Sequence, residues 1–179
     1  MFRRRMKDET QMLAFWLLPA PPAREYFRSM IEQLAQRFDA PGFEPHLTLY
    51  GTAFDVAHLD ALGGMPTPGS VELEIERIAF SEKYTKTLFV QFKQQTRLTE
   101  LSAAVARALG NENGHELNPH LSLIYKELPN EEKAELARTI NLPFDRVRFD
   151  AMKAVSTPAT IESREEVESW RTVWERSLS

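Results

Sequence analysis

The segments FEPHLTLY at 43–50 and LNPHLSLIY at 117–125 decide the interpretation of this 179-residue sequence. Both contain Pro-His-Leu, then a hydroxyl residue and another Leu, and both follow a predicted helix and a glycine-containing loop. A setting that occurs twice in one chain indicates an internal repeat. We therefore expect two pseudo-symmetric lobes, each supplying one strand that begins near its histidine, His46 or His120.

Each motif places polar and apolar side chains on opposite faces of its predicted strand. Side chains at positions i and i+2 of a strand point the same way, so His46 shares a face with Thr48 and His120 shares one with Ser122. The leucines between them face the other way, and we expect them in the core. The preceding prolines suit the first position of a strand. Each strand thus presents an imidazole beside a hydroxyl group.

Two such strands facing one cleft suit the hydrolysis of phosphodiesters. One histidine can take a proton from an attacking water while the other protonates the leaving alkoxide, because an imidazole titrates near neutral pH. Thr48 and Ser122 can donate hydrogen bonds to the phosphate oxygens. The pattern predicts catalysis by His46 and His120 without a metal ion or another cofactor, and it leaves open which of them is the acid.

The rest of the sequence predicts an α+β protein with mostly antiparallel strands. Strand 71–80 alternates apolar and charged residues, and the step from Ile75 to Ile78 indicates a bulge. Asn130 is the predicted N-cap of the last helix. Trp170 and Trp174 are spaced for one strand face that packs the core, although one of them could reach the cleft. Strands are expected at 12–18, 46–51, 71–80, 86–93, 120–125, 147–157 and 167–177, and helices at 23–38, 55–62, 97–109 and 130–140.

Composition excludes several classes of function. The net charge is -4 and the sequence pI about 5.7, which argues against a broad nucleic-acid surface. The chain has no cysteine, so disulfides, thiolate nucleophiles and Cys-type zinc sites are excluded.

The N-terminus imitates a secretory signal, but acidic residues interrupt its basic part and its apolar run is short. We expect a flexible extension at 1–10 followed by the first strand, and no run is long enough to span a membrane.

The remaining histidines do not form a metal-binding pattern. His58 lies in a predicted helix and is expected at the surface, whereas His115 lies in the loop before the second motif and could approach the cleft. Their spacing from His46 and His120 matches no compact ligand set. We therefore predict no metal site.

These motifs resemble those of a known family. PHLTL at 45–49 and PHLSL at 119–123 are similar to the paired H-x-T/S-x motifs of the 2H phosphoesterase superfamily, and AFWLLP near the N-terminus makes the chain most similar to its cyclic phosphodiesterase branch. The resemblance implies a single domain over 1–179 with two lobes. It also implies two antiparallel sheets that face a central cleft, with helices outside.

The resemblance further implies substrates and residue roles. The expected reactions are hydrolysis of ADP-ribose 1″,2″-cyclic phosphate and opening of nucleoside 2′,3′-cyclic phosphates. Trp16 and Tyr125 match aromatic positions that line the family's pocket, although core packing explains Trp16 equally well. Plain strand alternation puts Tyr125 opposite His120, so a bend at the strand end would be needed. The implied site comprises the catalytic pair His46 and His120, the phosphate ligands Thr48 and Ser122, and the aromatic residues Trp16 and Tyr125.

Two other functions stay open at this point. One is an enzyme acting on RNA ends that carry 2′,3′-cyclic phosphates, against which the acidic pI argues mildly. The other is a non-catalytic nucleotide- or RNA-binding module, which would not need two general acid–base groups. For the leading hypothesis we expect a monomeric cytoplasmic protein whose partner is a small cyclic nucleotide.

Overall fold

The computed structural model describes residues 10–65, 67–111 and 116–178. Most of the predicted N-terminal extension and all of His115 lie outside the described residues. The strands are β1 (Gln11–Pro19), β2 (Leu47–Ala53), β3 (Val71–Phe80), β4 (Leu88–Phe92), β5 (His120–Ile124), β6 (Arg146–Pro158) and β7 (Arg171–Ser177). The helices are α1 (Ala23–Phe38), α2 (Val56–Gly63), α3 (Thr96–Ala108), α4 (Asn130–Thr139) and α5 (Arg164–Glu168), with the 3-10 turn η1 at Tyr84–Lys86.

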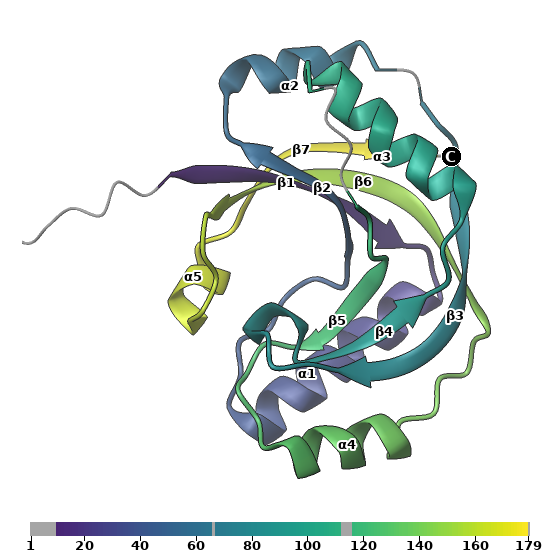
Figure 1. The fold of residues 1–179 in the computed structure, drawn as a ribbon, viewed down its shortest axis with the longest axis vertical. Coiled ribbons are helices and arrows are strands. Elements are labelled where there is room, and N and C mark those ends of the chain that lie inside the picture. The colour runs from purple at the N-terminus through teal and green to yellow at the C-terminus, as the bar shows by residue number, and fades with distance from the viewer. Residues whose placement is uncertain (1–9, 66, 112–115, 179) are drawn as a thin grey trace, which may run out of the picture.

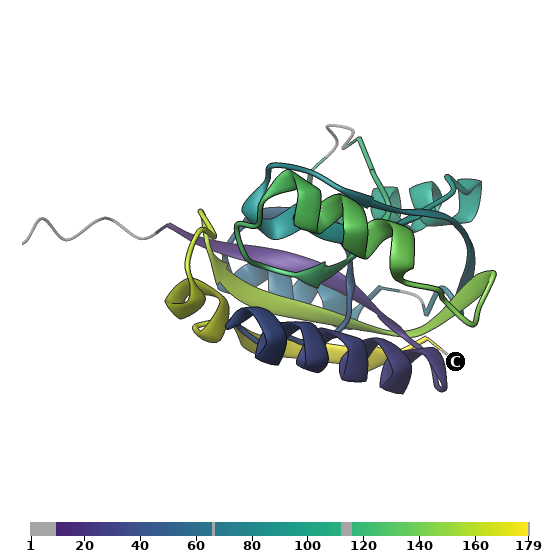
Figure 2. The ribbon, with the colours of Figure 1, turned by 90° about the horizontal axis from the view of Figure 1, so that it is seen from below.

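The strands form one antiparallel sheet in which six of them close into a ring. Hydrogen-bonded pairing runs from β1 through β2, β5, β4, β3 and β6 and returns to β1, and β7 pairs with the other edge of β6. The sheet is strongly curved, and helices lie around its outside (Figure 1). Figure 2 shows α1 along one side of the sheet and α4 along the other.

The α+β class is confirmed, but the two predicted sheets are halves of a single sheet. The long strand β6 joins them, because its first residues pair with β3 at 146–149 and the rest pair with β1 at 149–158. On the opposite side of the ring, β2 and β5 meet in one pair, Leu47 with Leu121. The two motif strands therefore touch each other where the two halves meet.

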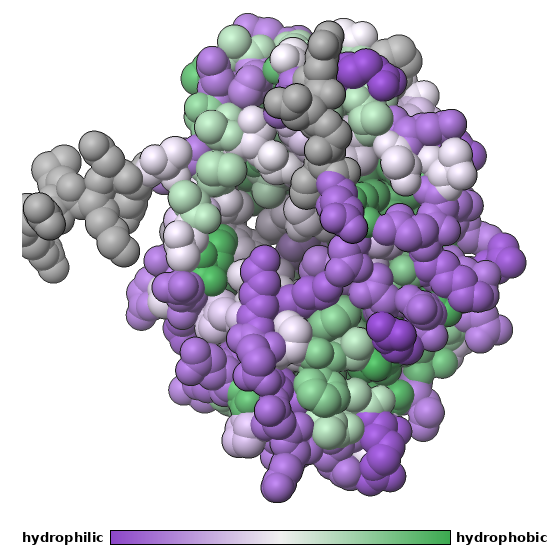
Figure 3. Space-filling view, viewed as in Figure 1, coloured by the Kyte–Doolittle hydropathy of each residue, from purple (hydrophilic) through white to green (hydrophobic). Residues whose placement is uncertain are grey.

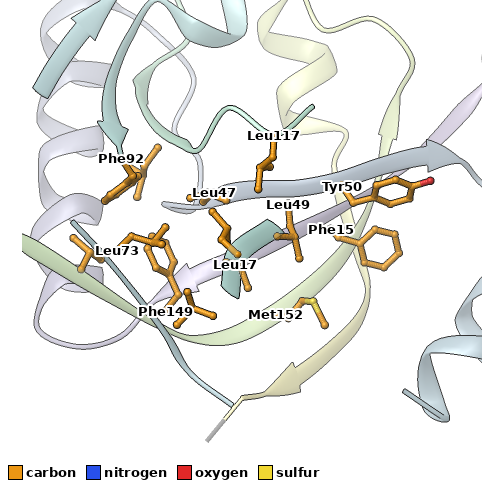
Figure 4. Packing of buried hydrophobic residues seen from close by; sticks show 14 of the residues in the cluster. Phe15, Leu17, Leu47, Leu49, Tyr50, Leu73, Phe92, Leu117, Phe149 and Met152 are labelled. Carbon is orange, nitrogen blue, oxygen red and sulfur yellow. The ribbon is translucent and has the colours of Figure 1, made fainter. Parts of the chain in front are cut away.

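The motif leucines lie in the core, as predicted. Leu47, Leu49, Leu121 and Leu123 are all fully buried, and each contributes about 1.5–3 kcal/mol through burial of its side chain. Figure 4 shows Leu47 and Leu49 within a cluster formed by several strands; its other labelled members are Phe15, Leu17, Tyr50, Leu73, Phe92, Leu117, Phe149 and Met152. This packing fixes the opposite faces of both motif strands.

Most predicted elements are present, and the differences are local. The register of β3 against β4 shifts between Ile75 and Arg77, which confirms the bulge. Asn130 is the first residue of α4, and Pro129 occupies the N-cap position without a side-chain cap, so the predicted cap was wrong. No described helix is long and apolar enough to cross a membrane.

The last predicted strand begins later than expected, because a short helix precedes it. The Ser163 side chain accepts a hydrogen bond from the backbone N–H of Glu166 and caps α5. The sequence S-x-x-E is a helix-start signal that the strand-like tryptophan spacing obscured. Trp170 therefore lies between α5 and β7, whereas Trp174 lies on β7 and packs against the core.

Candidate active site

The six predicted site residues line one cavity of about 360 Å³. Its volume lies within the range of about 300–1,000 Å³ usual for small-molecule sites. β1 contributes Trp16, the residue just before β2 is His46, and β2 itself contributes Thr48. β5 and the residue after it contribute His120, Ser122 and Tyr125. The closure of the ring at Leu47 and Leu121 thus brings together two segments that lie far apart in the sequence.

The two histidines are held in the same way. Nδ1 of His46 lies 2.7 Å from the carbonyl oxygen of Glu44, and Nδ1 of His120 lies 2.8 Å from the carbonyl oxygen of Asn118. A carbonyl oxygen only accepts hydrogen bonds, so Nδ1 carries the proton in both rings. In the neutral form Nε2 then has a free lone pair. Each ring nitrogen that remains available can therefore take up a proton and later return it.

Burial makes both imidazoles weaker bases. It is the main cause that lowers the pKa of His46 from 6.5 to about 4; the hydrogen bond to Glu44 opposes the shift, and the charge of His120 adds to it. The pKa of His120 is also lowered, mainly by burial and further by the nearby Lys86 and Lys83, while its carbonyl partner opposes the shift. Both rings are consequently neutral at pH 7, and an anionic phosphodiester beside either ring would favour its protonation.

Aromatic rings enclose His46. Trp16 stacks on it with ring centroids 3.7 Å apart and an interplanar angle of 12°. Trp170 contacts both rings edge-on, at 5.2 Å from Trp16 and 5.9 Å from His46. Trp16 therefore lines the cavity and packs at the same time, and the indole of Trp170 covers a side of His46 that water would otherwise reach.

Tyr125 reaches the cavity because β5 ends at Ile124. The chain leaves the strand there, so alternation no longer sets the direction of the Tyr125 side chain, and its hydroxyl lies 3.5 Å from Nε2 of His46. Its ring stacks on Phe43 with centroids 4.0 Å apart. Burial raises the pKa of the Tyr125 hydroxyl, which therefore remains protonated and can donate a hydrogen bond toward His46 or a ligand.

The two motif hydroxyls differ in their surroundings. Ser122 is 4% exposed, and its hydroxyl donates a hydrogen bond of 2.7 Å to the carbonyl oxygen of Thr85. Thr48 is exposed and lies opposite Trp16 in the register of β1 and β2. Thr48 can thus donate to a phosphate oxygen directly, whereas Ser122 must first release Thr85.

Some cavity residues were not predicted from the sequence. Trp170 was expected on a strand face, and which of the two tryptophans could reach the cleft was left open; the capped helix before Trp170 is the signal for its actual place. Lys83 and Thr85 line the cavity from the segment around η1, which carries no motif. His58 lies on α2, outside the cavity. Among the described residues, no group of three or more His, Asp or Glu side chains could hold a metal ion.

Comparisons with known proteins agree with this geometry. The sequence profile of the 2′-5′ RNA ligase superfamily matches residues 18–156. A cyclic phosphodiesterase of Arabidopsis thaliana is 25% identical over 167 residues, which make up 88% of this chain and 90% of that protein.

Solved structures share the fold at low identity. E. coli LigT complexed with 3′-AMP aligns with a TM-score of 0.58 and 12% identity, covering 94% of this chain and 98% of LigT. LigT complexed with NADP+ aligns with a TM-score of 0.55 and 14% identity, covering 93% and 97%. TT0787 of Thermus thermophilus aligns with a TM-score of 0.57 and 11% identity, covering 93% of this chain and 97% of TT0787.

Proposed function

The chain belongs to the 2′-5′ RNA ligase superfamily, the 2H phosphoesterases, and from this premise we propose that it hydrolyses small cyclic phosphodiesters with His46 and His120 as general acid and base. The expected substrates are ADP-ribose 1″,2″-cyclic phosphate and nucleoside 2′,3′-cyclic phosphates. The similarity to a cyclic phosphodiesterase supports this substrate class. The nucleotides bound to LigT, which has the same fold, are consistent with it.

The observation that carries the proposal is the matched pair of imidazoles. Both donate from Nδ1 to the carbonyl oxygen two residues earlier, and both line the same cavity. One Nε2 takes a proton from water as the water oxygen bonds to phosphorus. The other imidazole, protonated at Nε2, gives its proton to the leaving oxygen of the cyclic phosphate as the P–O bond breaks. The product is a phosphomonoester; the base now carries the proton taken from water, the acid has lost its own to the leaving oxygen, and proton exchange with solvent restores both imidazoles.

The hydroxyl groups stabilise the charge that develops on the phosphate. Thr48 donates from the exposed side of the cavity, and the protonated Tyr125 hydroxyl lies beside His46. Hydrogen bonds to the non-bridging oxygens strengthen as the transition state gains negative charge there. Because the two imidazoles transfer the protons and these hydroxyl groups stabilise the developing charge, the proposed reaction needs no divalent cation.

Hydrolysis of both substrate types by wild type, His46→Ala and His120→Ala tests the proposal. General acid–base catalysis contributes about 10²–10⁴-fold, so each variant should lose roughly that factor in kcat while its circular dichroism remains native. His58→Ala is the matched control, since His58 lies outside the cavity. Retention of wild-type kcat in either cavity variant would refute the two-histidine mechanism. Turnover on RNA ends alone would redirect the proposal to that substrate.

A further inference from the structure

A second hollow opens directly beside the reaction cavity. It has a volume of about 720 Å³ and lies between the segment around η1, residues 82–85, and the chain after β6, residues 159–162. Lys83, Thr85 and Ile161 line both spaces. A ligand whose cyclic phosphate lies between His46 and His120 can therefore extend past Lys83 into the second hollow without leaving the protein surface.

The second hollow is acidic beyond its border with the reaction cavity. Glu82, Glu127 and Glu162 line it, and among the described residues Lys83 at the border is its only lysine or arginine. Glu127 and Glu162 are exposed, and within the described part of the chain neither takes part in an ion pair. Glu82, by contrast, pairs with the buried Lys133 at 3.2 Å. The space thus offers one cation at its entrance and two uncompensated carboxylates further in.

We propose that this hollow is a specificity subsite for an uncharged, hydroxyl-bearing group, such as the second nucleoside of a dinucleotide-sized substrate. Carboxylates accept hydrogen bonds from hydroxyl and amino groups, as a carboxylate does from the ribose of bound dinucleotides. Lys83 meets the phosphate that connects the two units. A further phosphate would lie against Glu127 and Glu162 and be repelled. The subsite rests on the function proposed above and selects short substrates over longer strands.

The surface around the site agrees with this selection. Figure 3 shows hydrophilic residues mixed with hydrophobic patches on this face, and the sign of the overall charge follows from the sequence, whose net charge is -4. A protein that follows a nucleic-acid backbone uses a row of cations instead. Burial raises the pKa of the Tyr84 hydroxyl in the subsite wall; among the nearby charges that of Arg164 lowers this pKa, whereas those of Glu166, Glu165 and Glu127 raise it.

Three matched substrates test the subsite. They are adenosine 2′,3′-cyclic phosphate, the dinucleotide ApA ending in a 2′,3′-cyclic phosphate, and the same dinucleotide with an added 5′-phosphate. The plain dinucleotide should have a higher kcat/KM than the mononucleotide. The 5′-phosphate should lower kcat/KM by about threefold to tenfold at low salt, because repulsion between nearby exposed charges is of this size and is screened by added salt.

Charge-neutralising variants assign the effect to the carboxylates. In Glu127→Gln/Glu162→Gln the two dinucleotides should come within about twofold of each other, since the repulsion is removed. The control Glu32→Gln/Glu100→Gln changes the net charge equally at exposed positions outside both cavities and should keep the wild-type ratio.

The possible outcomes distinguish a failure of the subsite from a failure of the proposed function on which it rests. Equal kcat/KM for the two dinucleotides in the wild type, an unchanged ratio in Glu127→Gln/Glu162→Gln, or no advantage of the plain dinucleotide over the mononucleotide would overturn the subsite while leaving the reaction intact. Absence of turnover on all three substrates would overturn the proposed function and the subsite with it.

Discussion

Acidification should destabilise the folded protein through His46. This ring is buried, and its pKa is about 4 in the folded protein instead of 6.5. Between these two pH values the unfolded chain binds more protons than the folded chain. The free energy of unfolding therefore falls as the pH falls, and the stability associated with neutral His46, complete above pH 6.5, is lost on the way to pH 4.

The size of the effect follows from the two pKa values. Relative to pH 8, His46 should lower the free energy of unfolding by about 1 kcal/mol at pH 6, about 2 kcal/mol at pH 5 and about 3 kcal/mol at pH 4. The lowered pKa of His120 adds a contribution of the same sign. In His46→Gln the side chain cannot be protonated, so the contribution of His46 to the pH dependence disappears. Loss of the stack on Trp16 lowers the free energy of unfolding by the same amount at every pH and does not change this comparison.

Urea unfolding of wild type and His46→Gln at pH 8, 6, 5 and 4 measures this difference, and His58→Gln controls for the loss of an imidazole elsewhere. The wild-type stability should approach that of His46→Gln as the pH falls, by about 3 kcal/mol between pH 8 and pH 4. Parallel curves for these two proteins would show that His46 titrates alike in the folded and unfolded states. The argument from its burial by the aromatic rings would then fail.

Three further predictions concern the surroundings of the site. Lys153→Met removes the 2.7 Å ion pair that holds Glu44, whose carbonyl orients His46; steady-state kinetics should show kcat reduced by about threefold to tenfold with little change in KM, and an unchanged kcat would contradict this. Ser102→Ala deletes the 2.9 Å hydrogen bond to the carbonyl of Leu49 and should cost about 1–2 kcal/mol in urea unfolding, so a loss below about 0.3 kcal/mol would be evidence against it. Turnover should be unaffected by EDTA because imidazoles carry the protons in every step, and a strict requirement for an added divalent cation would refute the mechanism.

The sequence was sufficient to predict the elements that carry regular patterns. Helix 23–38 and strand 71–80 have the predicted limits, because apolar residues recur at helical spacing in the first and alternate with charged residues in the second. The two motifs likewise predicted which residues would share a cavity. Pairing of Leu47 with Leu121 explains why: a duplicated strand with one apolar face must bury that face, which leaves the imidazole face toward the cleft.

The sequence could not predict contacts that depend on where the chain turns. Trp170 covers His46 only because α5 redirects the chain before β7. Tyr125 enters the cavity because β5 ends one residue earlier; strand alternation did not predict this, and only the family resemblance placed Tyr125 in the pocket. The joining of the predicted sheets depends on how far β6 curves, which no local pattern encodes. The hydrogen bond from Ser122 to Thr85 likewise depends on the position of a segment without a motif.

These departures from symmetry give the two histidines different environments. Both motifs supply an imidazole with a protonated Nδ1, but His46 is 6% exposed between aromatic rings, whereas His120 is half-buried and feels the charges of Lys83 and Lys86. General acid and general base catalysis need one ring protonated and the other neutral at the same moment. Two identical environments would favour the same protonation state in both rings. In the proposed mechanism the duplicated strands thus supply the acid and the base, and the unduplicated surroundings, α5 and the segment around η1, make the two imidazoles unequal.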